Sequence, residues 1–137
     1  KYGSEVCSPV VEKGEADIII SFEQLEAARY VSYLKKGGHI ITSTQQIDPM
    51  PVITGAAQYP ANIVDTLKSL GEDVIAVDAL SLAEQAGTSR AVNVVLMGVI
   101  SHILDFGDKV WNDALEQCVP AKVLEVNKKA FGLGRNA

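Results

Sequence analysis

The sequence is poor in cysteine, in histidine and in clustered positive charge, and each shortage argues against a class of function. Its 137 residues include two cysteines and two histidines, and the net charge is −5. An iron–sulfur cluster needs four ligands, and two cysteines cannot supply them. Because no basic cluster offsets the negative charge, we expect no binding to nucleic acid or to an anionic membrane. Neither His39 nor His102 has a cysteine, histidine or carboxylate at ligand spacing, which argues against a metal site.

Long apolar runs are also missing. The longest, residues 91–104, is interrupted by Asn93, Ser101 and His102, so no segment is expected to cross a membrane. The hydrophobic content of 47% and charged content of 21% are typical of an ordinary globular protein. The length predicts a single domain over residues 1–137. We expect a cytoplasmic location with reduced thiols, where Cys7 and Cys118 act as packing residues.

Residues 16–46 predict a strand, a helix and a second strand. The run ADIIIS over residues 16–21 is rich in β-branched isoleucine, which is typical of a strand buried on both faces. Ser21 is predicted as the helix N-cap, with Gln24 completing a capping box. The pair Gly37–Gly38 should end this helix, and HIITS over residues 39–43 is the next strand. A unit of this length predicts a parallel pair with a right-handed crossover.

The rest of the chain continues the alternation of strands and helices. The predicted elements are an edge strand over 5–11, an extended connection over 47–60 with a short strand at 52–53, a helix over 61–70, a strand over 73–78, a short helix over 80–85, a buried helix over 90–104, a helix capped by Asp108, and a last helix that starts at Pro120 and ends before Gly132 and Gly134. This order predicts the α/β class: three layers, a mostly parallel sheet with helices on both faces, and a Rossmann-like arrangement.

Candidate binding residues follow from the rule that open parallel sheets bind ligands beyond the carboxyl ends of their strands. They are Ser21, Glu23, Glu26, Ser43, Thr44 and Asn93. Each also has a simpler structural explanation. Glu23 would suit the helix dipole, Ser43 and Thr44 would suit a turn or cap, and Asn93 would need a hydrogen-bond partner if buried.

No catalytic motif accompanies these residues. Asp78, at the end of a strand, is placed like a ribose-binding acid, but no glycine-rich fingerprint precedes it. Trp111 is interpreted as a core or interface anchor. With no ordered catalytic triad and no phosphate-binding loop, the residues alone predict an α/β domain with no catalytic residue and no metal ligand.

Several stretches resemble one known family. The run over residues 16–44, ADIIISFEQLEAARYVSYLKKGGHIITST, resembles the pattern "ADvlla-EplEalRyl-yLkpGG-vi-NT" of the gamma subunit or domain of 2-oxoacid:ferredoxin oxidoreductases, a family that includes the indolepyruvate oxidoreductase beta subunit. Further similar stretches are VCSPVVEKGEAD, residues 51–60, IAVDALSLAEQAGTSRAVNVVLMG and VPAKVLEVNKKAFGLG.

The chain departs from the family pattern at three places. Glu23-Gln24 stands where the family has Glu-Pro, and Ser43-Thr44 stands where it has Asn-Thr. The glycine-rich strand–loop–helix that opens the family's domain does not occur in this sequence, which we expect to start at a later strand of the family. Ligand contacts that depend on that loop are therefore not carried over to this chain.

The resemblance implies a subunit of a complex that decarboxylates a 2-oxoacid to an acyl-CoA and passes electrons to ferredoxin. It implies alpha and beta subunits that bind thiamine diphosphate with Mg²⁺, a ferredoxin-type subunit with iron–sulfur clusters, and CoA as co-substrate. This chain would assemble and border the complex and would be inactive in isolation, where a homodimer is one alternative. A free-standing nucleotide- or coenzyme-binding module and a structural interaction domain remain the rival hypotheses.

Overall fold

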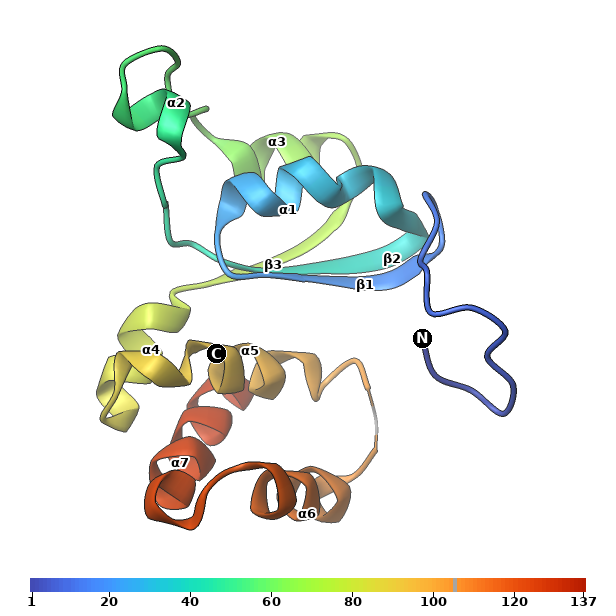
Figure 1. Cartoon of the computed structure of the whole chain (residues 1–137), viewed down its shortest axis with the longest axis vertical. Helices are drawn as coiled ribbons and strands as arrows, with labels where there is room; N and C mark the ends of the chain where they lie inside the picture. Colours follow the sequence, from blue (N-terminus) through green and yellow to red (C-terminus); the bar gives the residue numbers. More distant parts are fainter. Residues whose placement is uncertain (105) are drawn as a thin grey trace. The chain divides into compact units, whose positions relative to one another are not determined.

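The computed structural model describes residues 1–104 and 106–137, which form two compact units. The first unit comprises residues 1–42 and 46–75, and the second comprises residues 43–45 and 76–137. The first carries the predicted strand–helix–strand unit, and the second consists mainly of helices (Figure 1). Within the described ranges, no helix is both long enough and apolar enough to span a membrane.

The first unit contains the parallel pair that the sequence predicts. Strand β1 (Ala16–Ser21) leads to helix α1 (Gln24–Tyr30), to the short 3₁₀ helix η1 (Val31–Tyr33) and to strand β2 (Leu34–Ser43). β1 and β2 run parallel, with Ile19 opposite Ile40 and Ser21 opposite Thr42. The predicted parallel β–α–β unit is therefore confirmed.

Helix α1 is shorter than predicted. It ends at Tyr30, and Gly37–Gly38 lies within β2 instead of closing the helix. The two strands change register where Ala16 pairs with Leu34 and Ile18 with His39. At this irregularity Gly37 has a φ of +81°, and a Cβ on Gly38 would lie 2.7 Å from the carbonyl oxygen of Asp17. The glycines therefore serve a bulge and a close strand contact, which the sequence pattern alone does not distinguish from a helix end.

The connection after β2 contains a helix where a strand was predicted. Residues 52–53 belong to helix α2 (Met50–Ile53), with Pro51 in its first turn, where a missing N–H costs nothing. The predicted helix over 61–70 is confirmed as α3 (Ile63–Ser69), and Gly71 ends it at a φ of +88°.

Strand β3 (Asp73–Val77) completes an open sheet in the order β1-β2-β3. His39 lies beside the start of β3 at Asp73, and Thr44 lies beside its end at Val77, so β3 runs in the same direction as β2. The predicted α/β class, with an open, mostly parallel, Rossmann-like sheet, is confirmed.

The order of the strands decides how deeply each is buried. Ile40 and Ile41 point to opposite faces of the central strand β2, and both are fully buried. β1 is an edge strand of this sheet, and its Ile20 is 36% exposed, so the prediction that β1 is buried on both faces is wrong.

Helices α1 and α3 lie side by side over the same face of the sheet (Figure 1). Between them and the sheet lies the core of the first unit, formed by Ala27, Leu34, Ile40, Ile63, Leu67 and Val74. This packing of aliphatic side chains holds α1 against the sheet.

The predicted edge strand over residues 5–11 does not form. These residues have no regular secondary structure and are exposed, including Val6 and Val10. Pro9 within the run cannot donate a ladder hydrogen bond, which weakens any pairing of this segment. Cys7 is also exposed, so its predicted packing role is wrong.

The second unit consists of helices and short 3₁₀ turns. They are α4 (Ala79–Ala86), η2 (Ser89–Ala91), α5 (Val92–Ile100), α6 (Asp108–Cys118), η3 (Ala121–Val123) and α7 (Leu124–Arg135). Trp111 of α6 is buried between Phe106 and Phe131, with ring centroids 5.7 Å and 5.6 Å away. This agrees with its interpretation as a core anchor.

Several helix ends and side chains in this unit differ from the predictions. α5 covers 92–100 and not 90–104, and Gly107, not Asp108, occupies the N-cap of α6. Cys118 is exposed at the end of α6 and does not pack in the core. Because tertiary packing outweighs low helix propensity, Gly132 and Gly134 lie inside α7 and do not release a tail.

A close crossing of α5 and α7 explains Gly134, and with it Gly98. A Cβ on Gly134 would lie 2.0 Å from the carbonyl oxygen of Val95, and one on Gly98 would lie 2.2 Å from that of Phe131. Real Cβ atoms do not approach backbone so closely, so glycine at both positions lets the helix backbones touch. This confirms the prediction that Gly98 permits close backbone approach.

Gly134→Ala should therefore lower the free energy of unfolding by about 3 kcal/mol, because the methyl group overpacks the crossing. Gly132→Ala is the matched control in the same helix, since a Cβ there meets nothing within 4 Å. It should raise stability by up to about 1 kcal/mol through helix propensity. Urea unfolding of both variants measures the difference, and equal effects would contradict the close crossing.

Candidate functional site

The candidate site begins at the turn between β1 and α1, where Ser21 shapes the backbone. The Ser21 hydroxyl donates to the carbonyl oxygen of Glu23 at 2.5 Å and accepts the Glu23 N–H at 3.4 Å. Both residues are buried. Ser21 thus closes a tight turn, and the predicted capping box of Ser21 with Gln24 is wrong.

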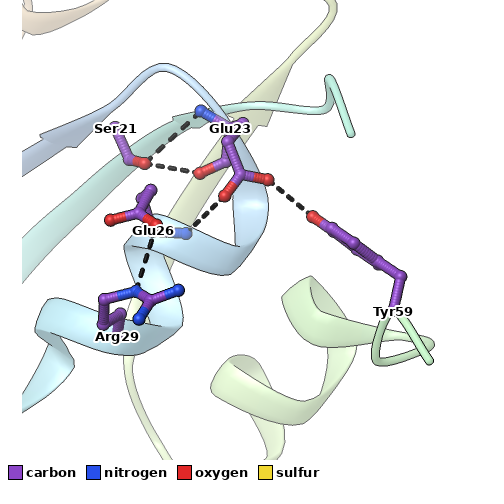
Figure 2. Close-up of polar contacts among 5 residues, drawn as sticks. All are labelled: Ser21, Glu23, Glu26, Arg29 and Tyr59. Carbon is purple, nitrogen blue, oxygen red and sulfur yellow. Dashed lines mark hydrogen bonds and ion pairs between the residues drawn. The ribbon is translucent and has the colours of Figure 1, made fainter. Parts of the chain in front are cut away.

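Glu23 is the N-cap of α1, where the sequence placed it in the first turn. Its backbone is extended, and its Oε1 accepts the Glu26 N–H at 2.7 Å. Its Oε2 accepts a hydrogen bond from the Tyr59 hydroxyl at 2.6 Å. Figure 2 shows the two bonds leaving opposite oxygens of one carboxylate, which is only 6% exposed. One side chain therefore satisfies the helix end and holds the connection that follows α2.

Tyr59 is the partner that the sequence analysis did not select. It packs against the core of the first unit while its hydroxyl reaches Glu23. Burial, with the neighbouring Glu23 carboxylate second, raises the pKa of Tyr59 to about 12. Tyr59 is thus a protonated donor at neutral pH. The only signal for it was its position in the Pro51–Pro60 stretch, where an aromatic residue precedes a proline.

Glu26 faces a wetter environment than Glu23. Its carboxylate accepts from Nε of Arg29 at 3.0 Å, and both side chains are about half exposed, at 46% and 56%. Exposed pairs of this spacing contribute little stability. Arg29 therefore neutralises Glu26, and Figure 2 shows that its guanidinium bonds with Glu26 and not with Glu23.

A cavity of about 510 Å³ opens beside these carboxylates. Its lining is mainly apolar and consists of Ile19, Ile20, Ser21, Phe22, Glu23, Glu26, Tyr30, Ile47 and Pro49. This volume falls in the range of ligand pockets. The structure thus brings Ser21, Glu23 and Glu26 together around one pocket in the first unit, at the carboxyl end of β1, as the rule for open sheets predicts.

The remaining candidates belong to the second unit. Ser43 is fully buried and its Oγ accepts the Gln45 N–H at 3.3 Å, while the Thr44 N–H donates to the Val77 carbonyl at 2.9 Å. Both residues thus help to shape the chain as it leaves β2. Asn93 is exposed on α5, so the requirement for a partner, which applied only if Asn93 were buried, does not arise.

Asp78 and the two histidines have structural roles. Asp78 caps α4 by accepting the Ser81 N–H at 3.0 Å and the Ser81 hydroxyl at 2.7 Å, and these bonds lower the pKa of its carboxyl. His39 lies within β2, not at a helix end or strand start, and its Nδ1 contacts Asp73 at 2.7 Å. His102 follows α5 and is exposed, not buried, with its Nε2 hydrogen-bonded to the Arg135 carbonyl.

The side chains of the described residues that could act as ligands do not fit a metal ion or an iron–sulfur cluster. Among the described residues, no three histidine, cysteine, aspartate or glutamate side chains gather as ligands. The two cysteines belong to different units and are both exposed. The pocket combines two carboxylates, the Ser21 hydroxyl and the Tyr30 phenol with apolar walls, an arrangement suited to binding.

Comparison with known proteins gives a consistent set of relatives. The family described as pyruvate ferredoxin/flavodoxin oxidoreductase matches residues 3–137. Indolepyruvate oxidoreductase subunit IorB of Thermococcus kodakarensis is 38% identical over 144 residues, covering 100% of this chain and 70% of that protein. The subunit of the same name from Pyrococcus horikoshii has the same identity and coverage. That of Archaeoglobus fulgidus is 34% identical, covering 96% of this chain and 68% of its own length.

The raised pKa of Tyr59, which is caused first by burial and second by the Glu23 carboxylate, should make stability depend on alkaline pH. The pKa of Tyr59 rises from its ordinary 10 to about 12 on folding, so the native state retains the proton more tightly. This contribution is complete below pH 10 and is lost as the pH rises towards 12. The free energy of unfolding should therefore fall more steeply between pH 10 and 12 in the native chain than in Tyr59→Phe, measured by urea titration. Parallel curves would contradict the raised pKa of Tyr59.

Proposed function

The chain belongs to the pyruvate ferredoxin/flavodoxin oxidoreductase family, and on that basis we propose that it is an assembly subunit of a 2-oxoacid:ferredoxin oxidoreductase complex. The observation that carries the proposal is the family match over residues 3–137, which spans both compact units. The pocket supports it, because its residues are suited to holding a partner or ligand. In this complex the chain borders the active centre, and partner chains carry the redox groups.

The reaction class follows from the relatives. Their name identifies indolepyruvate oxidoreductases, so the proposed substrate is a 2-oxoacid with an aromatic side chain. The complex would oxidise the acid and CoA to carbon dioxide and an acyl-CoA, with two electrons passing to ferredoxin. Thiamine diphosphate, Mg²⁺ and iron–sulfur clusters would belong to the alpha, beta and ferredoxin-type partners in the cytoplasm, since the donors of this chain do not fit them.

Because the partner chains would carry the redox groups, we predict activity only in the complex. We expect the purified chain to show no 2-oxoacid-dependent reduction of ferredoxin or of a viologen dye, even with thiamine diphosphate, Mg²⁺ and CoA. Co-expression with the thiamine-binding chain from the same source should give a complex that reduces the dye, with higher kcat/KM for indolepyruvate than for pyruvate or 2-oxoglutarate.

Three other results would each contradict a different part of the proposal. Turnover by the isolated chain would show that it carries its own active centre. A clear thermal shift of the isolated chain with one nucleotide, together with no stable complex, would favour a free-standing nucleotide-binding module. A complex that prefers pyruvate would retain the family assignment but overturn the aromatic substrate.

A further inference from the structure

The pocket beside Glu23 has aromatic and aliphatic walls that are unusually exposed. Phe22, Tyr30 and Ile47 are 51%, 50% and 52% exposed, and all three line the cavity. Single exposed apolar residues are ordinary on protein surfaces, but several around one concavity mark an interaction site. The cavity lies entirely within the first unit, so its shape does not depend on the second.

The Glu23 carboxylate in the pocket has no cationic partner within the described chain. Glu23 is only 6% exposed. Its two hydrogen-bond donors, the Glu26 N–H and the Tyr59 hydroxyl, are both neutral. No ion pair in the described chain includes Glu23, and Arg29 is bonded to Glu26. A buried carboxylate without a cation is costly, and a positively charged group that enters the pocket would recover part of that cost.

Arginine fits this environment better than lysine. Its guanidinium is planar, is weakly hydrated, and stacks on aromatic faces while it donates to a carboxylate. Phe22 and Tyr30 supply aromatic faces, and Ile20 and Ile47 supply apolar contacts for the methylene stem of an arginine. A strongly hydrated ammonium would lose more on entering the same apolar walls.

We propose that the pocket formed by Phe22, Glu23, Tyr30 and Ile47 is a docking site for an arginine side chain of a partner subunit. The arginine donates to the carboxylate of Glu23, and its stem and flanking apolar residues cover the exposed aromatic walls. This proposal rests on the proposed function for the origin of the partner. The chemistry of the pocket itself can be tested without any partner.

The first experiment uses the full chain and a small probe. Acetyl-arginine amide is titrated into isotopically labelled protein, with acetyl-citrulline amide as an uncharged isostere, and the amide signals of Phe22 and Glu26 are followed by NMR. The arginine probe should give saturable shifts at these residues, with binding at least about 30-fold tighter than the citrulline probe. Equal shifts from both probes, or none from arginine, would overturn the proposal.

The key variant is Glu23→Gln, which removes the charge with little change of shape. Its amide oxygen can accept the Glu26 N–H, and its amide nitrogen can donate to the Tyr59 oxygen, so the helix cap and connection can persist. Glu84→Gln, at an exposed position of α4, is the control with the same loss of charge. Glu23→Gln should weaken the arginine probe about 30-fold or more, and Glu84→Gln should leave it unchanged. Circular dichroism verifies that both variants fold.

The second experiment measures assembly with the co-expressed partner chain at low and high salt. Glu23→Gln should weaken assembly and reduce its salt dependence, whereas Glu84→Gln should do neither. Normal assembly of Glu23→Gln would overturn the docking role. Self-association of the isolated chain that Phe22→Ala abolishes would make the occupant a second copy and also overturn it. If the wild-type chain forms no complex, the proposed function fails, and the probe titration still decides the chemistry of the pocket.

Discussion

The structure of the site depends on one carboxylate, that of Glu23, at the junction of β1 and α1. It accepts a hydrogen bond from the first turn of α1 through one oxygen and from Tyr59 through the other. The first bond fixes where the helix begins, and the second fixes the end of the long connection between β2 and α3. The walls of the pocket come from these same segments, so its shape follows from how one side chain is satisfied. A change at Glu23 that loses both hydrogen bonds should therefore alter both the local backbone and the binding surface.

The sequence predicts the helices and strands whose apolar residues recur regularly, and it predicts the edge of the sheet where the pocket lies. It identifies β1, α3, β3 and the parallel pairing, because isoleucine-rich runs and a glycine stop are local signals. It also selects Ser21, Glu23 and Glu26. It does not predict Tyr59, since a hydrogen bond between residues 36 positions apart leaves no local pattern. The type of each element and the place of the pocket follow from local or periodic sequence patterns, whereas the partners of a buried carboxylate depend on tertiary contacts.

The glycines also show that a sequence pattern alone does not define a structural role, because the same residue type serves different roles in this chain. Gly71 ends α3 with a positive φ, as a helix-stop rule predicts. Gly37–Gly38 satisfies the same rule but serves a bulge in β2, and Gly134 sits inside a helix because another backbone touches it. Gly71 and Gly37 adopt a positive φ with nothing near the position of a Cβ, whereas Gly38 and Gly134 allow close backbone contacts. Sequence patterns thus locate these glycines without assigning their function.

Helix capping alone does not account for a glutamate at position 23. Serine, aspartate and asparagine are the preferred N-caps, and each could satisfy the Glu26 N–H with a shorter side chain. The additional methylene of glutamate lets one carboxylate serve both Glu26 and Tyr59, but a neutral glutamine would also bridge two such groups. What only glutamate adds to this bridge is a negative charge that is buried among neutral donors. A buried negative charge beside exposed aromatic walls supports the proposal that its cation comes from another molecule, which would make the pocket a surface for assembly.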